Sequence, residues 1–174
     1  MKLFSENIED LHTLYITNLK KALDMERKIT KALPTMIEKS TDPQLATAFS
    51  NHLEETRGHV IKVDNILREA TGDAGTATCK AISSLITEAE DGIKDAGDES
   101  IRDITLIAAA QQVEHHEIAV YGTLRNWAEL LGQTEAANTL ESILKEEKRA
   151  DELLTSISDT VNTATERTRT YTTV

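Results

Sequence analysis

The sequence predicts an all-α protein that folds as a bundle of long helices. Its 174 residues include only seven glycines and two prolines, and 3% of them are aromatic. Few helix breakers and few strand-favouring aromatic residues leave long windows with good helix propensity. Apolar residues recur along these windows every three or four positions, which is the spacing of one helix face. A chain of this length fits a single domain with its own core.

The first long helix is predicted over 6–40. Ser5 can cap it, and Pro34 lies inside it, so we expect a bend or local loosening near Thr30 rather than a break. The apolar pattern continues past the proline, through Leu11, Leu14, Ala22, Met25, Ile29, Leu33 and Met36.

The second long helix is predicted over 43–71. Asp42 supplies an N-cap, Pro43 occupies the first helical position, and Gly72 ends the pattern. Only a few residues separate this helix from the first, so the two are expected to be antiparallel neighbours.

The second half of the chain predicts a shorter helix over 81–96 and two long helices over 99–131 and 134–163. The connection between the second and third long helices is about 25 residues, long enough to run back along the bundle and make those two helices parallel. This order is typical of a ferritin-like four-helix bundle with a fifth, shorter helix in its crossover. We therefore expect one domain over 1–163 and a polar, disordered tail over 164–174.

Charge and cysteine content exclude several classes of function. The net charge of −11 opposes binding to a phosphate backbone, so we expect no nucleic-acid partner. No run of about 18 apolar residues occurs, and the single Cys79 cannot form an internal disulfide. These features predict a cytoplasmic protein that does not enter a membrane.

Acidic residues occupy positions where a helical core should be apolar. The stripe of the last long helix contains Glu147 and Asp151, four residues apart, and Glu55 and His59 repeat this spacing on the second helix. Carboxylates buried without partners cost several kcal/mol each, so they must be protonated, paired, solvated or bound to a cation. Glu26 on the first helix and Glu114 and Glu117 on the third long helix are expected at the same height along the bundle axis, and they are the remaining candidates.

This composition suits a pair of transition-metal ions. Two close cations repel each other, and several carboxylates can neutralise them while histidine supplies a neutral nitrogen ligand. The predicted ligands are Glu26, Glu55, His59, Glu114, Glu117, Glu147 and Asp151. Iron and manganese both suit them, and the alternative is a set of buried salt bridges to lysine or arginine.

Other side chains near these positions leave alternatives open. His52 is either a packed helix-face histidine or a hydrogen-bond partner of a ligand, and adjacent His115 and His116 cannot both face the centre. Tyr121 either packs in the core or donates its hydroxyl to a carboxylate.

The segments HLEETRGHV, IAAAQQVEHHEIAVYGTL and LKEEKRADELL resemble the bacterial ferritin-like stress proteins of the YciF type. The resemblance covers the chain from about Leu3 to Thr160 and implies a ferritin-like domain with a dinuclear metal motif, commonly a homodimer, and an association with stress responses. It implies no settled reaction. The chain departs from the broader Glu-x-x-His pattern, because His59 follows Glu55 by four residues and Asp151 stands where a second histidine is usual.

Three functions are consistent with these observations. The first is a dinuclear metal protein that oxidises Fe(II) with oxygen or peroxide. The second is an enzyme resembling manganese catalases, which disproportionates peroxide. The third is a structural helical bundle whose inward acids form salt bridges. No residue of the sequence identifies a catalytic group by itself.

Overall fold

The computed structural model describes residues 8–172, and the side chains of residues 8–166. This part of the chain is all-α and contains no strand, which confirms the predicted fold class. Its helices are α1 (Leu11–Lys39), α2 (Pro43–Thr71), α3 (Lys80–Asp95), α4 (Glu99–Leu130) and α5 (Thr134–Thr172).

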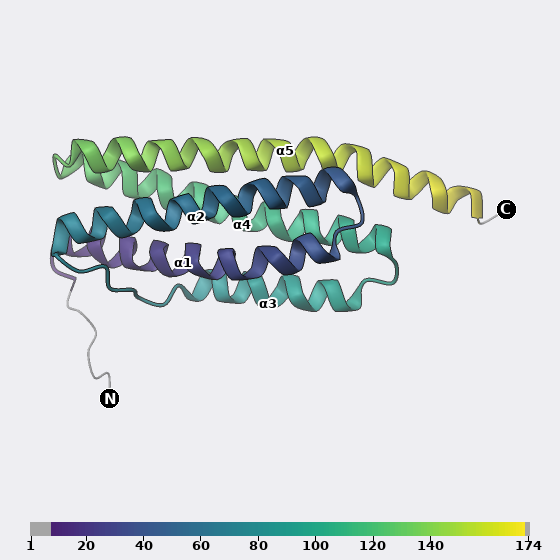
Figure 1. Ribbon diagram of the computed structural model, residues 1–174, viewed down its shortest axis with the longest axis horizontal. Helices are drawn as coiled ribbons and strands as arrows, with labels where there is room; N and C mark the ends of the chain where they lie inside the picture. The colour runs from purple at the N-terminus through teal and green to yellow at the C-terminus, as the bar shows by residue number, and fades with distance from the viewer. Residues whose placement is uncertain (1–7, 173–174) are drawn as a thin grey trace, which may run out of the picture.

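The helices form two antiparallel hairpins joined by the crossover that contains α3 (Figure 1). α1 packs against α2, and α4 packs against α5, while α2 meets α5 and α1 meets α4 to close the bundle. α3 lies outside this group against α1 and α4. Because the crossover returns along the bundle, α2 and α4 run in the same direction, as the sequence predicts.

Capping residues set the ends of the first hairpin. α2 has the predicted bounds, since Asp42 Oδ1 accepts hydrogen bonds from the backbone N–H groups of Gln44 and Leu45, and Gly72 ends the helix with φ at 76°. α1 begins later than expected, because Asp10 takes the N-cap position and accepts from the N–H of Thr13. The predicted cap, Ser5, lies outside the described residues.

The expectation of a disordered tail from residue 164 is wrong as far as Thr172, because α5 continues to that residue. Figure 1 shows this end of α5 extending past the other helices. Val161 and Thr165 are buried, and the Thr165 hydroxyl donates to the Val161 carbonyl. The helical stripe therefore continues in a segment whose composition is mostly polar. The predicted domain boundary at residue 163 remains a prediction.

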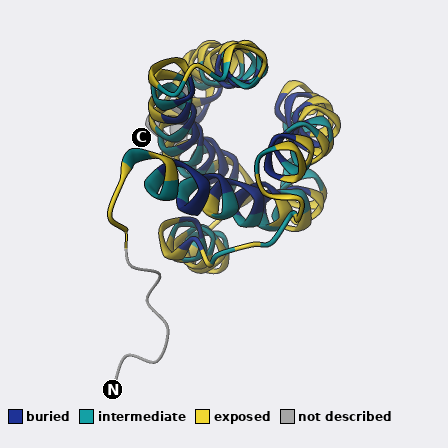
Figure 2. Cartoon of the chain, turned by 90° about the vertical axis from the view of Figure 1, so that its left-hand side faces the viewer, coloured by how far each residue is buried: buried dark blue, intermediate teal, exposed yellow. Residues whose placement is uncertain are grey.

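The core lies along the shared axis of the helices, where each helix presents its buried face (Figure 2). Aromatic and aliphatic side chains fill it, and the largest that are wholly buried include Tyr15, Leu19, Leu23, Met25, Leu45, Leu67, Leu106, Tyr121, Leu124, Leu140 and Ile143. Apolar layers thus lie on both sides of the polar site described below.

The buried carboxylate of Asp103 ties α4 to the turn between α1 and α2. Its two oxygens accept hydrogen bonds from the backbone N–H groups of Thr41 and Asp42, at 2.9 and 2.8 Å, and from the Thr41 hydroxyl. This contact joins the tip of the first hairpin to the first turns of α4. It therefore fixes how far α4 is shifted along the bundle axis relative to α1 and α2.

We expect Asp103→Ala to lower the free energy of unfolding by about 1–2 kcal/mol, because the backbone N–H groups of Thr41 and Asp42 would lose their acceptors at a partly buried site. Asp95→Ala, at an exposed position, is the matched control and should change stability by less than about 0.5 kcal/mol. Urea titration followed by circular dichroism measures both. Equal effects of the two substitutions would contradict the role given to Asp103.

Candidate metal centre

Six acidic and imidazole side chains from all four long helices meet in the middle of the bundle. Each is at least nine-tenths buried. They are Glu26 from α1, His52 and His59 from α2, Glu114 and Glu117 from α4, and Glu147 from α5.

Their donor atoms form two groups that share Glu147. One group contains His52, Glu114, Glu117 and Glu147, and the other contains Glu26, His59 and Glu147. Within each group the ligand atoms lie within 4.8 Å of one another. His59 Nδ1 is 2.9 Å from Glu147 Oε1, and His52 Nε2 is 3.2 Å from Glu114 Oε1. A carboxylate shared between two groups of donors can bridge two ions.

Many of these atoms have no hydrogen-bond partner among the described residues. They are Glu26 Oε2, both ring nitrogens of His52, His59 Nδ1, Glu114 Oε2, and both carboxylate oxygens of Glu117 and Glu147. Buried polar atoms are normally paired, so such a concentration in one place requires an explanation. Within the described part of the chain, the ion pairs of the four glutamates are with His52 and His59 and not with lysine or arginine, which removes the alternative of salt bridges to lysine or arginine.

Each of the two histidines also contacts a carboxylate outside the centre, through one of its ring nitrogens. His59 Nε2 lies 2.7 Å from Glu146 Oε2, and the same oxygen accepts a hydrogen bond from Lys62 at 2.8 Å. When His59 is neutral with its proton on Nε2, it would offer the lone pair of Nδ1 to a metal ion in the centre. His52 has a looser counterpart in Glu55, whose Oε2 is 3.9 Å from His52 Nδ1.

Burial dominates the electrostatics of the centre. It raises the pKa of Glu26 to about 7 and that of Glu114 to about 8, with the charge of Glu147 adding to both shifts, and it raises the pKa of Glu117 well above its usual range. Burial alone would lower the pKa of His52 and His59, but the neighbouring carboxylates raise both to about 9. Without a metal ion, the centre is therefore neutralised by bound protons.

The structure brings five of the seven predicted ligands together: Glu26, His59, Glu114, Glu117 and Glu147. The expectation that Glu55 faces the core is wrong, because its side chain is 42% exposed and lies 3.9 Å from Arg149. Asp151 stays at the edge, where its Oδ1 is 3.5 Å from His115 Nε2. Neither residue belongs to the two donor groups.

His52 is the member of the centre that sequence analysis did not assign as a ligand. The inward face of α2 passes through His52, Thr56 and His59, all of which are buried. Glu55 is three residues after His52 and four before His59, so it lies at the edge of this face, where its side chain is 42% exposed. The seven-residue spacing of the two histidines, which is two helical turns, was the signal that could have identified His52.

The remaining alternatives are also resolved. Tyr121 is completely buried and its hydroxyl donates a hydrogen bond to Glu26 Oε1, which leaves Glu26 Oε2 directed at the centre. His115 is 69% exposed, and His116 lies against Cys79, with its Nε2 3.8 Å from the cysteine Sγ. Neither of these adjacent histidines contributes to the donor groups.

A cavity of about 210 Å³ leads to the centre between α2 and α5. It is lined by Asn51, Glu55 and Arg149 toward its polar side and reaches His52 and Glu114. The cavity thus connects exposed Glu55 and Arg149 with the His52 end of the centre.

The fold and the buried carboxylate–histidine cluster define a ferritin-like helical-bundle protein. Residues 10–166 match the family described as a domain of unknown function, DUF892, and the chain belongs to that family. It is 37% identical to Protein YciF of Escherichia coli (strain K12) over 153 residues, which cover 87% of this chain and 92% of that protein. The resemblance to YciF-type proteins is thus confirmed.

Solved structures agree with this assignment. The E. coli stress protein YciF superposes with a TM-score of 0.85 at 35% identity, over 89% of this chain and 98% of that one. A ferritin-like, diiron-carboxylate protein from Bacillus anthracis superposes with a TM-score of 0.68 at 18% identity, over 86% and 99% of the two chains, a likeness of fold alone. No helix in the described residues is long and apolar enough to span a membrane.

We expect the metal-free protein to lose stability as pH rises from 6 to 9. Glu26, Glu114, His52 and His59 all have folded-state pKa values above their usual 4.5 or 6.5, so the folded state binds more protons than the unfolded state in this range. Their contribution is present at low pH and is lost as pH passes their folded-state values. Thermal unfolding of chelator-treated protein measures this, and a melting temperature that rises toward pH 9 would contradict it.

Proposed function

We propose that the chain is a dinuclear metal protein that takes up two Fe(II) ions as substrate and oxidises them with oxygen or peroxide, as part of a stress response. The observation that carries this proposal is the pair of buried donor groups sharing Glu147, with unpartnered atoms facing one another. The four glutamates carry four negative charges when ionised, which balance two divalent ions if both histidines are neutral.

The residues fit such ions by type as well as by charge. Carboxylate oxygen and imidazole nitrogen are ligands for iron and manganese alike. His52, Glu114 and Glu117 would hold one ion, Glu26 and His59 the other, and Glu147 belongs to both groups and could serve both ions. With peroxide as oxidant, two Fe(II) ions each give one electron, and two protons complete the conversion of hydrogen peroxide to two waters.

The side chains around the ligands have separate tasks in this proposal. Tyr121 fixes Glu26 through its hydroxyl, and Glu146 fixes the tautomer of His59. Lys62 holds Glu146 in place and keeps the pKa of that carboxyl low, together with His59 and against the effect of partial burial. Leu140, Leu144 and Leu154 are buried along the same face of α5 and exclude bulk water.

Anaerobic titration with Fe(II) tests metal uptake, with two ions expected per chain by elemental analysis. Glu147→Gln should reduce the number to one or fewer, because both donor groups lose the shared carboxylate. Glu152→Gln, on the exposed face of α5, is the matched control and should still bind two. Less than one ion per wild-type chain would refute the proposal in favour of a structural bundle.

Addition of oxygen or hydrogen peroxide to the Fe(II)-loaded protein should then produce the near-ultraviolet absorption of Fe(III). Oxygen release from hydrogen peroxide by the manganese-loaded protein would instead identify the catalase-like reaction. Two bound irons without oxidation by either oxidant would leave metal binding intact and eliminate the oxidation step.

Glu146→Gln should weaken binding at one of the two metal positions by about 10- to 100-fold, because it removes the carboxylate that orients His59. Competition with a chelator of known affinity, using Co(II), measures both positions separately. The position that contains His52 should keep its affinity in this variant. Equal weakening at both positions, or at neither, would show that Glu146 does not act through His59.

A further inference from the structure

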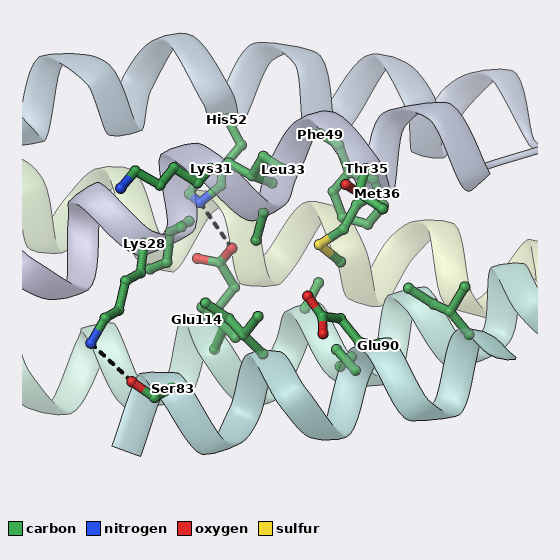
Figure 3. A pocket seen from close by; sticks show the side chains of 18 residues that line it. Lys28, Lys31, Leu33, Thr35, Met36, Phe49, His52, Ser83, Glu90 and Glu114 are labelled. Carbon is green, nitrogen blue, oxygen red and sulfur yellow. Dashed lines mark hydrogen bonds and ion pairs between the residues drawn. The ribbon is translucent and has the colours of Figure 1, made fainter. Parts of the chain in front are cut away.

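A second cavity, of about 360 Å³, lies between α1, α3 and α4 (Figure 3). Its volume falls within the range of about 300–1,000 Å³ that is usual for small-molecule sites. The walls are apolar and come from all three helices, with Ile29, Leu33 and Met36 from α1, Ile86, Ala89 and Ile93 from α3, and Ala109, Ala110 and Val113 from α4.

The inner end of this pocket is polar and belongs to the candidate metal centre. His52 and Glu114 both line it, and Figure 3 shows their side chains pointing toward each other. Both are more than nine-tenths buried, and Glu114 Oε2 has no hydrogen-bond partner among the described residues. An unpartnered carboxylate oxygen at the end of an apolar pocket is an acceptor for an O–H or N–H donor.

The mouth of the pocket is more polar than its walls. Exposed Lys31, Thr35 and Glu90 line it, while Lys28 is held by Asp24 and by the Ser83 hydroxyl, at 2.6 and 2.9 Å. A molecule that fits has an apolar body along the walls. Its inner end donates a hydrogen bond, and the buried glutamates at that end disfavour an anionic group.

We propose that this pocket binds a medium-chain aliphatic alcohol, with its hydroxyl donating to Glu114 beside His52. The wall of α3 is essential to this site, because the crossover helix closes the side that α1 and α4 leave open. A contact between the hydroxyl and a bound metal ion would require the proposed function. Binding of the alcohol to the metal-free protein does not depend on that function.

The first experiment measures binding of 1-octanol to the chelator-treated protein by NMR titration. We expect saturable binding of one molecule per chain, with shifts at Ala109 and Val113. Ala109→Phe fills the pocket and should weaken binding at least tenfold, as should the milder Ala89→Leu on the opposite wall. Ala108→Phe, on the exposed side of α4, should not. Absence of saturable binding, or equal effects of Ala108→Phe and Ala109→Phe, would overturn the proposal.

A matched ligand tests the polar end of the pocket. 1-Methoxyheptane has the same number of non-hydrogen atoms as 1-octanol but no O–H group. Because the ether has no O–H donor, the hydrogen bond to the carboxyl oxygen of Glu114 is lost, and the ether should bind about three- to tenfold more weakly to the metal-free protein. Equal affinities would overturn the assignment of Glu114 as acceptor.

The orientation is tested in the Co(II)-loaded protein with ¹³C-labelled 1-octanol. The paramagnetic ion should broaden the signal of the carbon that bears the hydroxyl more than that of the terminal methyl group. The reverse order would overturn the proposed orientation. Failure to bind cobalt at all would count against the proposed function, and the metal-free titrations would then decide the pocket separately.

Discussion

The main physical constraint on this structure is that four glutamates are buried together at the centre of a helical bundle, where their charge must be compensated. Glu26, Glu114, Glu117 and Glu147 lie in a core that excludes water, and no lysine or arginine among the described residues is paired with them. Unpaired charges there are costly, so the centre must bind either protons or metal cations. The raised pKa values describe the first state, and the geometry of the donors is suited to the second.

The two ends of the centre are built differently, although α2 supplies a histidine to each. On the side away from the centre, His59 is held by Glu146, which Lys62 restrains in turn, whereas His52 has the looser contact with exposed Glu55. Both cavities described above reach the His52 end. The centre therefore combines a firmly supported side with a side that small molecules can approach.

The crossover helix α3 has two consequences for this arrangement. It returns the chain along the bundle, so that α2 and α4 run in parallel and the four long helices meet at one level. It also covers α1 and α4 with a partly buried apolar face that includes Leu85, Ile86 and Ile93. A tight turn between α2 and α4 would provide neither the parallel pairing nor the wall of the apolar pocket.

The sequence alone determined the order of the helices and the presence of acidic residues in the core. Asp42 and Gly72 fix α2 by local hydrogen bonding and backbone conformation, and acids within an apolar stripe identify Glu147. Only tertiary packing decided which side chains of α2 enter the centre, because a rotation of about 100° between neighbouring residues exchanges exposed Glu55 for buried Thr56. Likewise, local composition predicted a tail from residue 164, whereas α5 continues to Thr172 and Val161 and Thr165 on it are buried.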